Sequence, residues 1–318
     1  MSQMRSQRGR GATSDGLADP ADCAMISPEE AGHLVLAMVS PLAPARVALS
    51  AASGYVLAET VRAAEAVPRF ANSAMDGYAL RARPVVGVLS TGDELAAPGD
   101  ALLPGKIRDA NRPALLAQLR RDGFPGLDLG ISADDQDVLW SRLEAGASRC
   151  DALIATGGVS AGDHDLLKVA LEKLGGGTMR RLHVAVKPGK HLAVASLGRR
   201  HVPAFALPGN PVAALVAYEL FVRSALLAMA GCPVPSRPRI AAIAETDLPR
   251  HPGPKLHAMR VIARAGPDGI VRVRPSGGQD SHMLRAMALA NALALVPGGS
   301  GVRAGGRVEV VLLDAVGL

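Results

Sequence analysis

Five polar, glycine-containing turns hold most of the residue types that could do chemistry in this chain. They are residues 90–94, 109–111, 156–165, 187–190 and 208–211. Each follows a short apolar run of the kind that forms a buried strand. Because the carboxyl ends of parallel strands meet at one edge of an open α/β sheet, where ligands bind, we expect these turns to converge on one site.

The glycines and the cap residues of these turns suit a phosphorylated ligand. Gly157 and Gly158 would let backbone N–H groups approach an anion closely. Asn210 stands at a cap position and Pro211 at the first helical position, which predicts a helix N-terminus free to face a phosphate.

Lysines and aspartates of the same turns add charges of both signs. Lys187 and Lys190 flank a Pro-Gly pair and would act as point charges for an anion. Asp109, Asp163 and Asp165 offer the hard oxygens that Mg²⁺ prefers beside a phosphate. Any single aspartate could instead be a helix cap, and the lysines could be solvated. Together they favour metal-assisted chemistry on a phosphate.

Several other functional motifs are missing from the sequence. No G-x-G-x-x-G opens the first strand–helix turn, and no G-x-S-x-G or H-E-x-x-H occurs. Residues 99–106 resemble a P-loop, but the spacing is wrong and Ile107 stands where Ser or Thr is needed. The cysteines Cys23, Cys150 and Cys232 are far apart, which argues against a disulfide framework.

Length and composition set the frame for these sites. The chain has 318 residues, 48% hydrophobic and 20% charged, enough for two or three domains with packed cores. Only 3% of the residues are aromatic, which weakens an interpretation as a single-strand nucleic-acid binder. The net charge of +6 suits an anionic partner, although it could also be spread over solvated faces.

The elements that would position the turns change character along the chain. Residues 1–24 are predicted to be a disordered tail, and 25–83 an N-terminal domain with helices from Ser27 and over 45–58. Residues 84–232 alternate short strands with helices, which predicts an α/β fold with a mostly parallel, three-layer sheet. Residues 233–318 show a period of two, which predicts a small β domain with one helix near 282–288.

Neither a membrane span nor a secretion signal is expected. The apolar run 211–232 contains Glu219 and Arg223, so we predict a buried helix. The first twenty residues are polar and lack the apolar core of a signal peptide, so we expect a cytoplasmic protein.

Five motifs in order identify a family resemblance. They are NSAMDGYA at 72–79, STGDEL at 90–95, TGGVSAGDHD at 156–165, KPGK at 187–190 and LPGNP at 207–211. From about residue 25 to its end, the chain resembles the MoeA family of molybdopterin molybdenumtransferases, which includes the gephyrin E domain. Its α/β region also looks like the MoaB/Mog fold.

The resemblance implies a reaction and a set of site residues. The family inserts molybdate into adenylylated molybdopterin with Mg²⁺ and releases AMP. By motif, the catalytic residues would be Asp76, Asp109, Asp165, Lys187 and Lys190, with Asp109 and Asp165 on the metal and Asp76 reaching in from the partner of a homodimer. The residues expected to hold the ligand are Thr91, Gly92, Asp93, Gly157, Gly158, Ser160, Pro208, Gly209, Asn210 and Pro211. Contact with a molybdopterin adenylyltransferase is possible for such a protein, whereas nucleic acid and membrane partners are not expected.

The sequence departs from the family pattern mainly by a gap. Only residues 80–88 lie between Ala79, which ends the first motif, and Leu89, which precedes the STGDEL motif, where the family has roughly a hundred residues, a domain-sized piece. We therefore expect the second domain of the family to be missing. Ala110 and His191 stand where the family usually has Thr and Pro. Two alternatives to an active transferase stay open: a non-catalytic molybdopterin-binding scaffold and a Mog-like molybdopterin adenylyltransferase.

Overall fold

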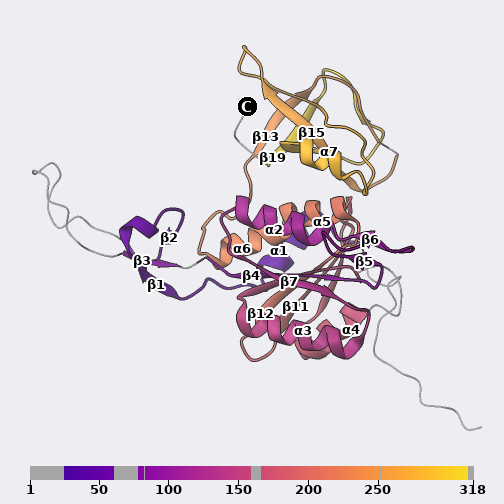
Figure 1. Ribbon diagram of the computed structural model, residues 1–318. Helices are drawn as coiled ribbons and strands as arrows, with labels where there is room; N and C mark the ends of the chain where they lie inside the picture. Colours follow the sequence, from indigo (N-terminus) through magenta and orange to yellow (C-terminus); the bar gives the residue numbers. More distant parts are fainter. Residues whose placement is uncertain (1–24, 61–77, 82, 159–165, 251, 314–318) are drawn as a thin grey trace, which may run out of the picture.

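A six-stranded sheet with the order β7-β4-β8-β12-β11-β9 forms the middle layer of the α/β region (Figure 1). Its strands are β4 (Val86–Thr91), β7 (Gly126–Ser132), β8 (Ala152–Thr156), β9 (Arg180–His183), β11 (His191–Leu197) and β12 (Val202–Leu207). The first four strands in sheet order are parallel to one another, and β11 pairs antiparallel with both β12 and β9. Every residue of β4, β8 and β12 is buried, as expected for parallel strands covered on both faces.

The structure is a computed structural model that describes residues 25–60, 78–81, 83–158, 166–250 and 252–313. Asp76, Ser160, Asp163 and Asp165 lie outside the described residues, and so does the predicted tail 1–24. The predictions made for these residues therefore stay predictions.

Helices cover both faces of the central sheet, which confirms the three-layer prediction. One face carries α1 (Pro28–Leu36), α2 (Asn111–Arg121) and a continuous helical run of α5 (Pro211–Ala217), the π-helical turn η2 (Tyr218–Val222) and α6 (Arg223–Met229). The other face carries α3 (Gln136–Arg149) and α4 (Leu166–Gly175). The first helix begins as the sequence predicts, since Ser27 Oγ accepts from the N–H of Glu30 at 3.0 Å.

The helical run Pro211–Met229 is long and apolar enough to cross a membrane by length and composition. However, 72% of its most apolar window is buried inside the fold. It therefore packs as a core helix, with Tyr218 and Phe221 among the largest fully buried side chains.

The predicted helix over 45–58 is wrong. This segment holds β1 (Pro44–Val47), the short 3₁₀ turn η1 (Leu49–Ala51) and β2 (Val56–Leu57), and both strands pair with β3 (Tyr78–Arg81). Gly54 takes a positive φ of 80° in the turn before β2, where a helix could not continue. The small sheet lies to one side of the α/β layers in Figure 1.

The C-terminal region is a β domain next to the face that carries α2 and α5 (Figure 1). Its strands are β13 (Arg239–Ala244), β15 (Leu256–Ala265), β16 (Val271–Pro275), β17 (Ala292–Val296) and β19 (Arg307–Leu312), and they pair in a closed ring. The predicted short helix is present as α7 (Leu284–Leu289). Two two-stranded pairs, β5 (Leu95–Ala96) with β6 (Ile107–Arg108) and β14 (Leu248–Pro249) with β18 (Gly301–Val302), lie outside the main sheets.

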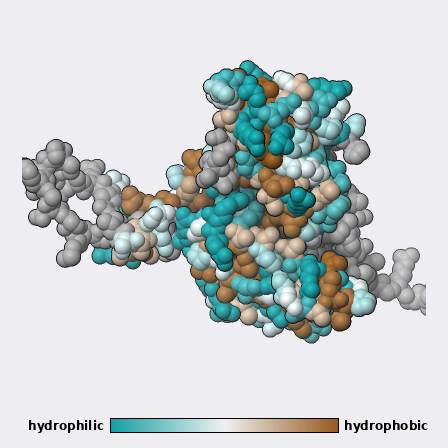
Figure 2. Space-filling model, turned by 45° about the horizontal axis from the view of Figure 1, so that its top comes forward, coloured by the Kyte–Doolittle hydropathy of each residue, from teal (hydrophilic) through white to brown (hydrophobic). Residues whose placement is uncertain are grey.

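One strand of the α/β region belongs to the C-terminal sheet. β10 (Val186–Lys187) pairs in parallel with β15, with Lys187 opposite His257 and Val186 opposite Leu256. The two regions are therefore joined by a strand pairing in addition to the Pro-rich segment 233–238. On the face shown in Figure 2, hydrophilic residues are spread over both regions and do not gather in one block.

Candidate ligand-binding site

Three of the five predicted turns meet at the carboxyl edge of the central sheet. Ser90 at the end of β4 donates from Oγ to Asp109 Oδ1 at 2.9 Å, and its Oγ lies 3.1 Å from Thr156 Oγ1. Thr91 Oγ1 donates to the backbone oxygen of Thr156 at 3.2 Å. These buried hydroxyls tie the ends of β4 and β8 to the segment that precedes α2.

Glycines allow the fourth turn to pack against the others. Gly157 has φ of 101°, and a Cβ there would lie 2.5 Å from Thr91 Oγ1. A Cβ on Gly209 would lie 3.7 Å from Gly157 Cα, and Asn111 Nδ2 donates to the oxygen of Gly209 at 2.8 Å. Gly157 therefore serves a close backbone approach within the protein, and the 208–211 loop sits beside it.

The turn 187–190 reaches the same edge by a different route from the expected one. It precedes β11, and because β11 runs antiparallel to β12, the start of β11 lies where β12 ends. Likewise, 109–111 follows β6, which lies outside the central sheet. Only 90–94, 156–158 and 208–211 follow strands of that sheet.

The turn 187–190 and the loop 208–211 line one cavity of about 400 Å³, which we call the Lys190 cavity. Its walls are Lys187, Pro188, Gly189, Lys190, His191, Pro208, Asn210, Ala213, Gln279, Asp280, Ser281 and His282. The site thus lies between the α/β region and the segment 279–282 of the C-terminal domain. Of the residues predicted from the sequence, it brings together both lysines with Pro208 and Asn210.

The start of α5 is only partly available to a ligand. Asn210 is the N-cap, Pro211 follows at the first helical position, and the Asn210 side chain makes no capping bond. The N–H of Val212 donates to the oxygen of Ser281 at 3.1 Å. One of the donors expected to face a phosphate is therefore taken by the C-terminal domain.

Arg260 supports the C-terminal wall and is not among the residues predicted from the sequence. It is fully buried in β15, and its Nη2 donates to the oxygens of Gly278 and Asp280 at 3.3 and 3.2 Å. Gln279 bonds the Arg260 backbone through both ends of its amide. Burial lowers the pKa of Arg260 to about 10, and its Nε and Nη1 have no hydrogen-bond partner among the described residues. The sequence signal that could have identified Arg260 is a charged residue within the apolar run of a predicted strand.

Asp109 is held by protein donors on both carboxylate oxygens. It is 3% exposed and accepts from Ser90 Oγ, from the Arg112 N–H at 3.2 Å and from Arg112 Nε at 2.8 Å. In the described part of the chain, no group of three His, Cys, Asp or Glu side chains could hold a metal ion. Because Asp165 lies outside that part, the predicted aspartate pair is not placed.

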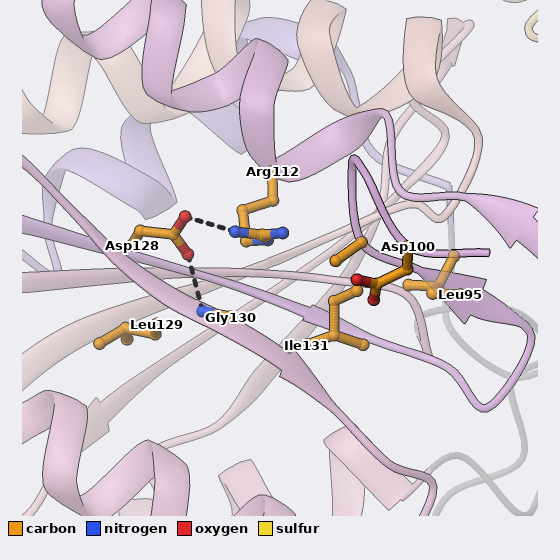
Figure 3. A pocket seen from close by; sticks show the side chains of 8 residues that line it. Leu95, Asp100, Arg112, Asp128, Leu129, Gly130 and Ile131 are labelled. Atoms are coloured by element: carbon orange, nitrogen blue, oxygen red, sulfur yellow. Dashed lines mark hydrogen bonds and ion pairs between the residues drawn. The ribbon is translucent and has the colours of Figure 1, made fainter.

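Arg112 also bonds Asp128 on the edge strand β7, at a second cavity of about 660 Å³ (Figure 3). Asp128 in turn accepts from the N–H of Gly130 at 2.8 Å. The Asp128 carboxylate and the Arg112 guanidinium at this cavity therefore pair with each other. None of the residues predicted for ligand binding lines it.

Asp93 and Gly92 occupy the turn after β4, on its β7 side. Asp93 Oδ1 accepts from the N–H of Asp134 at 3.0 Å, and Asp134 Oδ2 accepts from the N–H of Asp93 at 3.3 Å. Gly92 has φ of 146° and donates to the oxygen of Ser132. This turn is fixed to the end of β7, and neither residue lines the Lys190 cavity.

The histidine beside the lysines is neutral near pH 7. Burial, followed by the charge of Lys190, lowers the pKa of His191 to about 4. Its ring stacks on His183 with centroids 5.3 Å apart. The positive charge of this wall thus comes from lysine ammonium groups.

Three family descriptions match successive parts of the chain. Residues 26–112 match the MoeA N-terminal region (domain I and II), 87–228 match a probable molybdopterin binding domain, and 241–313 match the MoeA C-terminal region (domain IV). Only residues 82–85 lie between β3 and β4. The predicted loss of the second domain, like the domain boundaries, stays a prediction.

Known proteins of similar sequence and structure agree with these matches. The chain is 32% identical to the molybdopterin molybdenumtransferase of Bacillus subtilis, and the match covers 89% of this chain and 60% of that protein. It is 34% identical to molybdopterin molybdenumtransferase 2 of Mycobacterium tuberculosis, with 66% of this chain and 51% of that protein covered. A solved molybdenum cofactor biosynthesis protein from Pyrococcus furiosus has the same fold, with a TM-score of 0.66, 22% identity, and 91% of this chain and 100% of that chain covered. The chain thus spans between about half and three-fifths of these curated relatives. With its regions matching MoeA parts in order, the chain belongs to the MoeA family.

Proposed function

We propose that this chain acts in molybdenum cofactor biosynthesis as a molybdopterin molybdenumtransferase, which inserts molybdate into adenylylated molybdopterin and releases AMP. The observation that carries the proposal is the Lys190 cavity, which two lysines line together with Pro208, Asn210 and the segment 279–282 of the C-terminal domain. The curated relatives bear the name of this activity.

The residues of the cavity suit an anionic substrate. Lys187 is exposed and Lys190 half-buried, so both ammonium groups can meet a phosphate or an oxyanion without first breaking a buried ion pair. In a partly closed cavity such charges act more strongly than in bulk water. Lys187 and Lys190 would therefore bind the substrate and stabilise negative charge that develops on the leaving phosphate.

Mg²⁺ is part of the proposal, but the arrangement of Asp109 does not fit it as a metal ligand. Both of its carboxylate oxygens accept bonds from Ser90 or Arg112, and the Arg112 guanidinium would repel a cation. Asp109 could bind a metal only if its ion pair with Arg112 were broken. We therefore derive no catalytic step through the metal.

A homodimer is also proposed, because the family resemblance places Asp76 in the cleft of the partner subunit. Light scattering at micromolar concentration tests it directly, and a monomer would leave Asp76 without a cleft to reach.

The activity is tested with purified protein, adenylylated molybdopterin, molybdate and Mg²⁺, by measuring AMP release. We expect release that depends on molybdate, and a loss of roughly a hundredfold in Lys190→Met, because one preorganised charge contributes about that much. The matched control is Arg199→Met, which removes an exposed cation from the turn between β11 and β12, at the opposite edge of the sheet.

An absence of molybdate-dependent AMP release would refute the transferase. If molybdopterin still bound tightly, the protein would be a non-catalytic scaffold, which the engagement of Asp109 by Arg112 favours as the second candidate. Equal losses in Lys190→Met and Arg199→Met would show that the Lys190 cavity is not where the reaction takes place.

A further inference from the structure

A smaller cavity of about 260 Å³ adjoins the Lys190 cavity, and Lys187 lines both. Its remaining walls are Arg250, the 252–254 segment, Lys255 and His257. We call it the Lys255 cavity. It lies where β10 of the α/β region pairs with β15 of the C-terminal domain, so Lys187 and His257 are register neighbours.

Backbone bonds hold the loop that forms its outer wall. Arg250 donates from its guanidinium to the oxygens of Gly253, Val296 and Pro297, which ties Arg250 and Gly253 to the end of β17. The N–H of Gly299 donates to the oxygen of Gly253 at 3.1 Å. A Cβ on Gly298 would lie 3.2 Å from that same oxygen, so the two loops are closely packed. The wall is fixed by the fold.

His257 is a buried polar side chain with no partner in the described structure. It is 4% exposed, and neither Nδ1 nor Nε2 has a hydrogen-bond partner among the described residues. A buried imidazole normally has one, because an unmade bond costs about 1–3 kcal/mol. His257 is one of the residues that line the cavity, so a ligand there could supply the missing partner.

The charges around this cavity are all positive among its described lining residues. Lys187, Arg250 and Lys255 carry cations, and no described lining residue carries a carboxylate. Burial lowers the pKa of Lys255, and the positive charges of Lys190 and Lys187 lower it further. Burial, followed by Arg260, Lys187 and Arg250, lowers the pKa of His257 to about 4. An anion would relieve this repulsion.

We propose that the Lys255 cavity is a second anion subsite, which binds a phosphoryl group through Lys187, Lys255 and a ring N–H of His257. The ligand chemistry is a phosphate oxyanion, either free or carried by an organic molecule, and the probes below distinguish these two sources. The subsite differs from the Lys190 cavity, and it does not depend on the molybdenum chemistry proposed above.

Titration calorimetry of the full chain tests the subsite with three probes: inorganic phosphate, glycerol phosphate and molybdate. We expect phosphate and glycerol phosphate to bind, and Lys255→Met to weaken both at least tenfold. Molybdate affinity should stay within twofold, because the Lys190 cavity is intact in this variant. The matched control is Arg264→Met, which removes an exposed cation from the same strand, β15, and should change no affinity more than twofold.

A second measurement uses the unaltered protein and so does not depend on how a variant folds. Proton NMR should show the His257 ring resonances shifting on addition of phosphate, while those of His201, an exposed histidine between β11 and β12, stay in place. Failure of phosphate to bind, unchanged phosphate affinity in Lys255→Met, or a loss of molybdate affinity alone would overturn the proposal. Such a result would not refute the transferase proposal, because AMP release tests the neighbouring Lys190 cavity.

Discussion

Two regions of this protein gather arginines, lysines and acids in opposite ways. Around Glu219, in the α/β region, every described charge has a partner of opposite sign. Around the Lys255 cavity, the described lining charges are of one sign. Both regions combine a segment of the α/β fold with a segment that leads into or belongs to the C-terminal domain, so the difference lies in chemistry and not in location.

The cluster around Glu219 is a closed ion network. The Glu219 side chain is fully buried and accepts from Gln118 at 3.0 Å, from Arg237 at 2.7 Å and from Arg121. Asp122 meets Arg237 and Arg223 and accepts from the Tyr218 hydroxyl at 2.9 Å. Burial and the charge of Asp122 raise the pKa of Tyr218, so its hydroxyl stays a donor.

The comparison separates two uses of buried charge. Paired charges fix one packing arrangement, here the attachment of the 233–238 segment to α2 and η2 through Arg237. Like charges gathered around one cavity raise the energy of its empty state and favour any ligand that neutralises them. Variants that remove one charge should therefore affect stability strongly in the first region and ligand binding in the second.

The largest stability effect is expected from Glu219→Gln. It keeps the volume but leaves Arg121 and Arg237 without the buried negative charge, which should lower the free energy of unfolding by about 3–5 kcal/mol. Urea denaturation measures this value. Glu309→Gln, which breaks a half-exposed pair with Arg239, should cost no more than about 1 kcal/mol. Equal effects would remove the distinction between network and surface pair.

Asp109→Asn tests a carboxylate at the carboxyl edge of the central sheet. Asp109 is buried and paired with an arginine, as the acids of the Glu219 network are. We expect a loss of about 3 kcal/mol in unfolding free energy, because Arg112 keeps only Asp128. The Mg²⁺ concentration that supports half-maximal AMP release should stay unchanged. Asp134→Asn, at the exposed turn opposite Asp93, serves as the control. A large shift in the Mg²⁺ requirement without lost stability would instead make Asp109 a metal ligand.

Acid should weaken the fold through the neutral histidines of the cationic walls. His191 and His257 have pKa values of about 4 in the folded protein, against 6.5 ordinarily. Between these values the unfolded chain binds more protons, so stability falls as the pH drops from about 6.5 towards 4. His257 alone should contribute roughly 2 kcal/mol between pH 7 and 5. Thermal unfolding at both pH values measures it, and His257→Gln should flatten the profile. An unchanged slope would mean that His257 is already charged.

The sequence was sufficient to predict the α/β layers, since continuous apolar strands such as Ala152–Thr156 and capped helices such as Pro28–Leu36 have strong local signals. The sequence also predicted that the 187–190 and 208–211 turns lie at one site, and both turns line the Lys190 cavity. The helix predicted over 45–58 failed because pairing with β3 overrides local propensity, and that partner lies more than twenty residues away.

The contributions of the C-terminal domain to the site could not be predicted from spacing alone. His257 meets Lys187 through the pairing of β10 with β15, and Gln279 reaches the Lys190 cavity with the segment whose Ser281 oxygen accepts from Val212; both contacts have long sequence separation. Asp109 precedes α2 and Arg112 lies in its first turn, so the two residues are close in sequence and their pairing could have been inferred from it.

The parallel pairing of β10 with β15 has a consequence for how the molecule comes apart. Because two residues of the α/β region serve as an edge strand of the C-terminal sheet, and β10 lies between β9 and β11 in the chain, neither region can unfold without exposing a row of backbone groups in the other. The Pro-rich segment 233–238 therefore separates the two regions along the chain, but we expect the two regions to unfold together. A protease that cuts there should leave two fragments that remain associated.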